Sequence, residues 1–364
     1  MSPASDWGRR AGLLGLAAGL ASAGAAAGVA AERRAVARRL RRDEPGPELV
    51  PHVPTEELAV VAGDGVPLHV EVDVHEGAAH PDLTVVLVHG YALSLECWWY
   101  QRRDLDAGRV VLYDQRGHGR SGRGDPARAT IEQLGDDLHR VLAQTVPEGP
   151  VLLVGHSMGG MTVMALADQH PELFDGRVVG VGLLSTSPGR MAEVTFGIPS
   201  AGARLLRRVA PPVFAQLAKR PAFVARGRQV GSDVELLLTK RWSFGSDVPA
   251  SLVEYVSRMI AQTPIETVAD FWPAFDDHDK LHALAVLDDV PVLVLVGDED
   301  LLTPAEHSRQ IAAALPHAEL VVVPDAGHLV LLEHPGTVNA HLRDLVARAT
   351  AGDAGSSRDR AVGG

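Results

Sequence analysis

The 364-residue sequence contains a single cysteine, Cys97, which excludes an intrachain disulfide and any zinc or iron–sulfur site built on cysteine ligands. Aromatic residues make up only 4% of the chain, so alanine, valine and leucine must fill most of the core. Basic residues are also in deficit, 34 against 46 acidic residues, for a net charge of −12. Such a chain lacks the surplus of Lys and Arg that nucleic-acid binding requires, and this excludes nucleic acid as a general partner.

The residues that are present are those of a folded chain. Hydrophobic residues make up 46% and charged residues 22%, and the length allows one large domain or two smaller ones. The charge is divided unevenly along the sequence. Residues 1–42 contain eight arginines and two acidic residues, for a charge of +6, which leaves −18 for the rest of the chain. This asymmetry predicts a short basic head that differs physically from a long acidic body.

Within the head, residues 11–31 contain no charged side chain and are long enough to span a bilayer as one helix. The segment is rich in alanine and glycine. We interpret it first as a membrane anchor or membrane-surface helix, with a cleaved secretory signal and a plain tail as the alternatives. The arginines that follow it favour the cytoplasmic side for the body. We therefore expect a cytoplasmic body, with or without membrane association, in preference to a secreted one.

The body follows a proline-rich linker at residues 43–57. Two alternating runs, 58–61 and 68–74, flank a Gly-Asp-Gly turn and predict an antiparallel hairpin. Six continuous apolar runs follow, of the kind typical of strands buried on both faces, at 84–88, 109–113, 151–155, 177–184, 291–297 and 319–323. Helical patterns alternate with these runs at 130–146, 158–169, 304–315 and 337–349. The sequence therefore predicts an α/β fold with a doubly wound, mostly parallel eight-stranded sheet.

One stretch interrupts this alternation. Between about 188 and 287 the sequence has only helix-period segments, such as 233–241 and 249–261. A helical insertion of this size predicts a cap between strands six and seven, lying over the C-terminal ends of the strands. The α/β domain then continues to residue 349, and residues 350–364 are predicted to form a disordered tail.

The strongest motif is Gly155-His156-Ser157-Met158-Gly159, which follows a strand-like run and precedes a helical pattern. This is the G-x-S-x-G pattern in the strand–turn–helix context that a nucleophile elbow requires. Glycine is needed at both ends because side chains there would clash across the turn. The hydroxyl of Ser157 would then be exposed near a helix N-terminus, where developing negative charge is stabilised.

A serine hydroxyl becomes a good nucleophile only when a base removes its proton. Among 16 histidines, His328 stands out because it follows the last predicted strand, at the sheet edge where Ser157 is expected. The acid that orients the imidazole can come from the segment after the preceding strand, where Asp298, Glu299 and Asp300 compete. The candidate nucleophile, acid and base then occur along the chain in the order Ser, Asp, His, which is the order expected for a nucleophile elbow of this kind.

The oxyanion that forms when a carbonyl is attacked needs preformed N–H donors. The backbone N–H of Met158, directly after the serine, is one expected donor. The natural second is the N–H of Tyr91, which follows the strand at 84–88. This chemistry implies no cofactor and no metal.

Over residues 58–349 the body resembles the α/β-hydrolase fold superfamily, in particular its capped esterase, lipase and peptidase-like branch. The resemblance is carried by HGY (89–91), DQRGHGRS (114–121), GHSMGG (155–160), GDEDLLTP (297–304) and GHLVLLEHP (327–335). It implies that Asp300 is the acid, with Asp298 as the alternative, and that a cap lies between strands six and seven. Because the elbow carries Ser157 and not an aspartate, the dehalogenase and epoxide-hydrolase branches are disfavoured.

The sequence thus predicts a serine hydrolase of carboxylic esters, thioesters or amides, acting through an acyl-enzyme on a small-molecule acyl substrate. Two alternatives stay open. One is a cofactor-free haloperoxidase-like enzyme or a carbon–carbon bond hydrolase on the same scaffold, and the other is a non-catalytic, membrane-tethered binding protein. The sequence does not define an oligomeric state.

Other conspicuous residues favour structural interpretations. His118, His156 and Asp114 are expected to support turns and packing, and Cys97 is expected to be a buried thiol. The acidic segment around His278 and His282 suggests a solvated loop in preference to a metal site, because it lacks consistent ligand spacing. The aromatic residues of the cap are expected in its core, with an acyl pocket as the alternative: Trp242, Phe244, Tyr255, Phe271 and Trp272.

Overall fold

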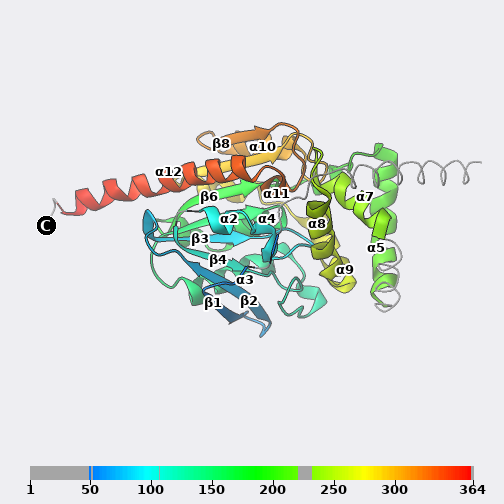
Figure 1. Ribbon diagram of the computed structural model, residues 1–364, viewed down its shortest axis with the longest axis horizontal. Coiled ribbons are helices and arrows are strands. Elements are labelled where there is room, and N and C mark those ends of the chain that lie inside the picture. Colours follow the sequence, from blue (N-terminus) through cyan, green and yellow to red (C-terminus); the bar gives the residue numbers. More distant parts are fainter. Residues whose placement is uncertain (1–48, 51, 106, 220–231, 362–364) are drawn as a thin grey trace, which may run out of the picture.

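The computed structural model of the protein describes residues 49–50, 52–105, 107–219 and 232–361 (Figure 1). The predicted basic head, with its apolar segment 11–31, lies outside the described residues. In the part of the chain that is described, no helix combines the length and apolar character needed to cross a membrane.

Eight strands form one sheet in the order β1-β2-β4-β3-β5-β6-β7-β8. The pairs β1–β2 and β2–β4 are antiparallel, and all the other neighbours are parallel. The predicted doubly wound, mostly parallel sheet is therefore confirmed. The strands are β1 (Glu56–Val61), β2 (Pro67–Val74), β3 (His80–Val88), β4 (Ala107–Tyr113), β5 (Val151–His156), β6 (Val178–Leu184), β7 (Val292–Gly297) and β8 (Glu319–Val323).

The continuous apolar runs are explained by cores on both faces of the sheet. In β3, Val85 and Leu87 enter one hydrophobic core, whereas Val86 and Val88 enter another. Successive side chains of a strand point to opposite faces, so a strand covered on both sides needs apolar residues at every position. The body helices that supply this cover are α3 (Ile131–Thr145), α4 (Met158–Gln169), α10 (Ala305–Ala314) and α12 (Pro335–Ala361), with the short α2 (Gln101–Asp104) and α11 (Val330–Glu333).

The helix ends follow the capping pattern of the sequence. Thr130 precedes α3, and its Oγ1 accepts a hydrogen bond from the N–H of Gln133 at 3.1 Å. At the other end of the body, α12 continues to Ala361 and covers residues that the sequence predicted as a disordered tail. The structure differs there because extending an existing helix carries no new nucleation cost, and the extension contains no proline.

The described helices between β6 and β7 are α5 (Ser200–Ala218), α7 (Ser232–Ser243), α8 (Ala250–Gln262) and α9 (Ile265–Asp277). Figure 1 shows these helices together at one end of the sheet, away from the free end of α12. This arrangement is the helical cap expected from the interrupted strand–helix alternation. The C-terminal ends of the central strands and the cap therefore face one another across the site described below.

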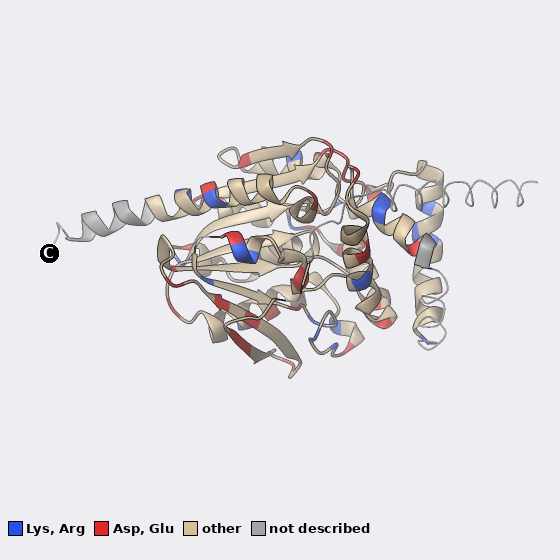
Figure 2. Ribbon diagram, viewed as in Figure 1, with Lys and Arg blue, Asp and Glu red and all other residues tan. Residues whose placement is uncertain are grey.

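Buried charges tie the antiparallel edge of the sheet to the body. Figure 2 shows acidic residues gathered on β1 and β2. The guanidinium of Arg102, 1% exposed, donates to Glu71 and to Asp73, each at 2.8 Å. Arg116 is also fully buried and donates to Asp137 at 2.6 Å and to Asp64 at 2.9 Å. Each buried arginine thus has two carboxylate partners, which buried charge requires.

Candidate active site

Ser157 lies on the sharp turn between β5 and α4. Its φ of 55° and ψ of −118° are a strained conformation for a residue with a side chain. The flanking glycines make this turn possible. A Cβ at Gly155 would lie 2.4 Å from the carbonyl oxygen of Gly159, and a Cβ at Gly159 would lie 2.0 Å from that of Val88. The G-x-S-x-G segment therefore has the close backbone contacts of a nucleophile elbow.

His328 reaches Ser157 from the loop after β8. Its Nε2 lies 3.0 Å from Ser157 Oγ, and its Nδ1 lies 2.9 Å from Oδ2 and 3.1 Å from Oδ1 of Asp300. An ionised carboxylate only accepts hydrogen bonds, so Nδ1 carries the proton and donates to Asp300. Nε2 is then free to accept the hydroxyl proton of Ser157. Three strand ends far apart in sequence thus place a hydroxyl, an imidazole and a carboxylate in one hydrogen-bonded chain.

Asp300 is held as an anion by its surroundings. It is 3% exposed, and burial alone would raise the pKa of its carboxyl. The charge and hydrogen bond of His328 and the donors of Thr303 outweigh burial and leave this pKa below its usual value. Oδ1 accepts the N–H groups of Leu302 and Thr303, each at 2.9 Å, and Oδ2 accepts the Thr303 hydroxyl at 2.8 Å. Thr303 was not identified from the sequence as a partner of Asp300. Its position three residues after Asp300, in the DLLT segment, could have indicated a threonine that donates hydrogen bonds back to the carboxylate.

The alternative acid is placed differently. Asp298 is exposed, and its Oδ1 accepts the N–H of Ala326 at 3.4 Å. The structure therefore brings Asp300 to His328 and directs Asp298 to the backbone of the loop before His328.

The two predicted oxyanion donors lie next to the elbow. Met158 is the first residue of α4, directly after Ser157. Tyr91 follows β3 through Gly90, where a Cβ would lie 3.1 Å from Ser157 Cβ. The Tyr91 hydroxyl donates to the carbonyl of Val268 in α9 at 2.5 Å. The loop that carries the Tyr91 N–H is thus adjacent to the nucleophile and tied to the cap.

A buried polar network supports this loop, and sequence reasoning did not find it. Gln115 Nε2 donates to the carbonyl of His89 at 2.6 Å, and the N–H of Gln115 donates to His89 Nε2 at 2.9 Å. Thr162 on α4 donates its hydroxyl to Gln115 Oε1 at 2.8 Å. Burial lowers the pKa of His89 to about 4, so the ring is neutral above that pH. The network joins the loop before Tyr91 to the helix that follows Ser157.

A cavity of about 270 Å³ lies between the strand ends and the cap. Ser157 and His328 line it from the body, and the cap side is predominantly aromatic and aliphatic. Of the predicted cap aromatics, Trp242 and Trp272 line the cavity. The others do not: Phe244 and Phe271 are buried in hydrophobic cores, and the Tyr255 hydroxyl donates to the carbonyl of Glu96 at 2.9 Å. The aromatic residues of the cavity are Tyr91, Phe196, Phe214, Trp242, Trp272 and Phe275.

Two other histidines have the structural placement expected for them. His156 is fully buried and donates from Nε2 to the carbonyl of His328 at 2.9 Å, so it supports the loop that carries the base. His118 donates from Nδ1 to the carbonyl of Arg116 at 3.0 Å. Burial lowers the pKa of each imidazole to about 3, which keeps both neutral at physiological pH. Cys97 is buried, as predicted.

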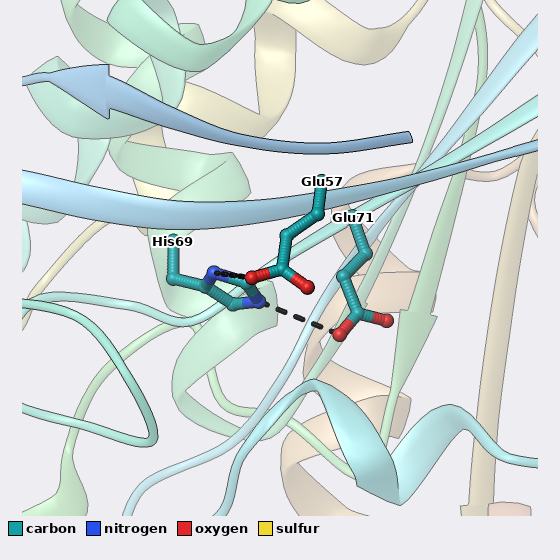
Figure 3. A group of neighbouring side chains, drawn as sticks. All are labelled: Glu57, His69 and Glu71. Atoms are coloured by element: carbon teal, nitrogen blue, oxygen red, sulfur yellow. Dashed lines mark hydrogen bonds and ion pairs between the residues drawn. The ribbon is translucent and has the colours of Figure 1, made fainter. Parts of the chain in front are cut away.

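Among the described residues, one group has the ligand types and spacing for a metal ion: Glu57, His69 and Glu71 (Figure 3). His69 lies 3.9 Å from Glu57 and 3.4 Å from Glu71. These carboxylates already pair with cations, because Arg120 contacts both of them and Arg102 contacts Glu71. The group is therefore better described as an ionic cluster of the sheet edge.

The acidic segment before β7 has partners of its own. His278 pairs with the carbonyl of Ser187 at 2.9 Å, and His282 pairs with Asp168 at 2.9 Å. These two histidines thus bind different parts of the body.

Comparison with known proteins places the chain in a family. Residues 84–335 match the alpha/beta hydrolase fold family, and the chain belongs to it. Proline iminopeptidase PfmaB of Pestalotiopsis fici is 29% identical over 245 residues, which are 65% of this chain and 81% of that protein.

Solved structures agree with this assignment. A thermophilic esterase from Thermogutta terrifontis is similar with a TM-score of 0.63 and 26% identity, covering 81% of this chain and 99% of its own. The enol-lactonase from Burkholderia xenovorans LB400 is similar with a TM-score of 0.62 and 26% identity, and the match covers 80% of this chain and 100% of that one. The protein is an α/β-hydrolase.

Proposed function

We propose that this protein is a serine hydrolase that cleaves carboxylic esters, or the related thioesters and amides, through a covalent acyl-enzyme. The observation that carries the proposal is the hydrogen-bonded chain from Ser157 through His328 to Asp300, which opens into an apolar cavity. The similarity to an esterase and to an enol-lactonase supports an ester or lactone carbonyl as the target.

The first half of the reaction forms the acyl-enzyme. Ser157 Oγ attacks the carbonyl carbon of the substrate while His328 Nε2 takes the hydroxyl proton. The N–H groups of Tyr91 and Met158 donate to the oxyanion of the tetrahedral intermediate. The intermediate collapses when the bond to the leaving group breaks, and the leaving group takes the proton from His328. Asp300 stabilises the imidazolium without accepting its proton.

The second half releases the acyl group. A water molecule gives a proton to His328 Nε2 and attacks the carbonyl carbon of the acyl-enzyme. A second tetrahedral intermediate breaks its bond to Ser157 Oγ, which recovers the proton from His328. The product is a carboxylic acid, and the hydroxyl, imidazole and carboxylate return to their starting protonation states.

The cavity supports a compact, mainly apolar acyl or alcohol group. Its aromatic walls favour apolar substrate by burial, at roughly 0.8 kcal/mol per buried methylene. Its volume of about 270 Å³ limits this gain to groups that fit inside. We therefore expect turnover to rise with acyl length over short chains and to fall for chains longer than the cavity.

The test is a panel of 4-nitrophenyl esters from acetate to dodecanoate, assayed with the full chain. The Ser157→Ala variant, purified in the same way, controls for contaminating esterases. The proposal predicts Ser157-dependent turnover with an optimum at short or medium acyl length. The proposal is overturned if the folded protein leaves esters, thioesters and anilides intact. Halogenation of an acceptor with peroxide and halide, or cleavage of a carbon–carbon bond, by such a protein would favour the alternative functions.

A further inference from the structure

One ion pair lies in the otherwise apolar cap wall of the cavity. Arg207 comes from α5 and Asp276 from α9, and Arg207 Nη1 donates to Asp276 Oδ1 at 2.8 Å. Both residues line the same cavity as Ser157. Among the described residues that line the cavity, Arg207 and Asp276 are the only members of the Asp, Glu, Lys and Arg types. The rest of the cap side is aliphatic or aromatic.

Arg207 is held in place by more than its carboxylate partner. The guanidinium Nη2 donates to the carbonyls of Met191 and Val194, the latter at 3.2 Å. The guanidinium carbon also lies 5.0 Å from the centre of the Phe196 ring, within the range of a cation–π contact. Loss of the Asp276 charge would therefore leave the arginine fixed at the cavity wall by three other contacts.

The pair would alter the electrostatic field that a substrate in the cavity experiences. A lone guanidinium in an apolar cavity would attract an anionic group strongly, because neighbouring low-dielectric walls screen charges less than water does. A carboxylate 2.8 Å from the guanidinium offsets most of this field. An anionic substrate would then meet no net attraction and would lose its hydration shell on entry.

We propose that Asp276 masks Arg207 and thereby restricts the cavity to uncharged acyl or alcohol groups. Asp276 and Arg207 are thus specificity-determining residues, and the carboxylate of Asp276 is the element that excludes anionic substrates. The inference rests on the proposed esterase function for its kinetic test, and it has a second test that needs no turnover.

The kinetic test compares two esters of equal acyl length, 4-nitrophenyl hexanoate and the mono-4-nitrophenyl ester of adipic acid, which adds a carboxylate at the far end. The ratio of kcat/KM for the adipate ester to that for the hexanoate ester is measured in the wild type and in Asp276→Asn. We expect this ratio to rise about tenfold or more in Asp276→Asn, because the Arg207 charge is unmasked.

Two further variants separate masking from other effects. Asp277→Asn makes the same change of net charge at an adjacent, exposed position outside the cavity lining, and its ratio is expected to stay within about twofold of the wild type. The double variant Asp276→Asn with Arg207→Gln should lose the gain. An unchanged ratio in Asp276→Asn, or an equal rise in Asp277→Asn, overturns the proposal.

The second test measures binding alone. Trp242 and Trp272 line the cavity, so their fluorescence reports its occupancy. Titration with hexanoate anion and with 1-hexanol should give tighter hexanoate binding in Asp276→Asn than in the wild type, about tenfold, with hexanol unchanged. If the wild type leaves esters, thioesters and anilides intact, the proposed hydrolase function fails, and this titration still decides the masking proposal. Equal hexanoate affinity in wild type and Asp276→Asn contradicts it.

Discussion

The body and the cap both border the cavity, but they differ in how their polar and charged groups are held. On the body side, Ser157, His328 and Asp300 form one hydrogen-bonded chain, and the buried Arg102 and Arg116 each bind two carboxylates. On the cap side the walls are aromatic and aliphatic, and the Arg207–Asp276 pair is partly exposed, with Asp276 at 45%. Under the proposed function, we expect the body to fix the reacting geometry and the cap to determine which substrate reaches it.

The largest effect is expected from the nucleophile. Ser157→Ala should reduce kcat for 4-nitrophenyl butyrate by about 10⁵- to 10⁶-fold, because the covalent route is lost. The fold should be retained, since the methyl group of alanine fits where the hydroxymethyl group was. Steady-state kinetics with circular dichroism as the control check this. Near-normal turnover by the variant would place the chemistry elsewhere.

The second-largest effect is expected from the carboxylate that pairs with His328. Asp300→Asn should lower kcat by about 10⁴-fold, because an amide no longer fixes the His328 tautomer or stabilises its cation. Asp298→Asn is the matched control, with the same substitution two residues away on the same loop. We expect the Asp298 variant to stay within about tenfold of the wild type. The assignment of the acid is reversed if Asp298→Asn is the more damaging change.

The buried ion pairs of the body predict a stability effect that an exposed ion pair of the body should not share. Arg116→Ala removes the partner of Asp137, whose side chain is 1% exposed, and should lower the free energy of unfolding by about 3–5 kcal/mol. Arg128→Ala, which loses a 54% exposed arginine 3.8 Å from Asp64, should change it by less than about 0.5 kcal/mol. Urea denaturation measures both, and equal losses would refute the distinction.

The cap predicts a change of selectivity with little change of chemistry. Trp272→Ala enlarges the cavity and should raise the kcat/KM ratio of decanoate to butyrate esters several-fold, at roughly constant kcat for butyrate. Trp99→Ala is the control, because Trp99 lies outside the cavity lining and donates to the carbonyl of Val50. If both variants shift the ratio equally, the cap wall does not set acyl preference.

The last effect is confined to acidic pH and concerns stability at the sheet edge. Burial raises the pKa of Glu71, but hydrogen bonds from His69 and Arg102 outweigh it and lower this pKa from 4.5 to about 2. Its stabilising contribution is therefore present above pH 4.5 and is lost as the pH falls toward 2. The unfolding free energy should fall more steeply between these values in the wild type than in Glu71→Gln. Parallel pH profiles would contradict this ionic role, and exposed Glu148→Gln serves as the control.

Much of the body could be predicted from sequence because its signals are local. The strand β5 and the elbow at Ser157 are adjacent in the chain, and the flanking glycines are required by backbone contacts that any such turn makes. His328 could be predicted because parallel strands bring their C-terminal ends to one edge. Choosing Asp300 over Asp298 required the resemblance to known hydrolases.

The cap was less predictable because its contacts are not local. α5 contains Pro211 and Pro212, which weaken the helical pattern, and sequence reasoning did not define this helix. Its inner residues, such as Phe214, face the cavity only through the packing of α5 against α9. Likewise, Trp272 and Phe271 are neighbours in sequence, yet one lines the cavity and the other is buried in a core.

The most direct test of the central claim is mass spectrometry of the full chain after reaction with a fluorophosphonate, followed by peptide mapping. The account predicts one phosphonyl adduct, on Ser157, which forms slowly or not at all in His328→Ala because the base is missing. An unmodified Ser157 in an enzyme that still hydrolyses esters, or an adduct on a different residue, would contradict the account.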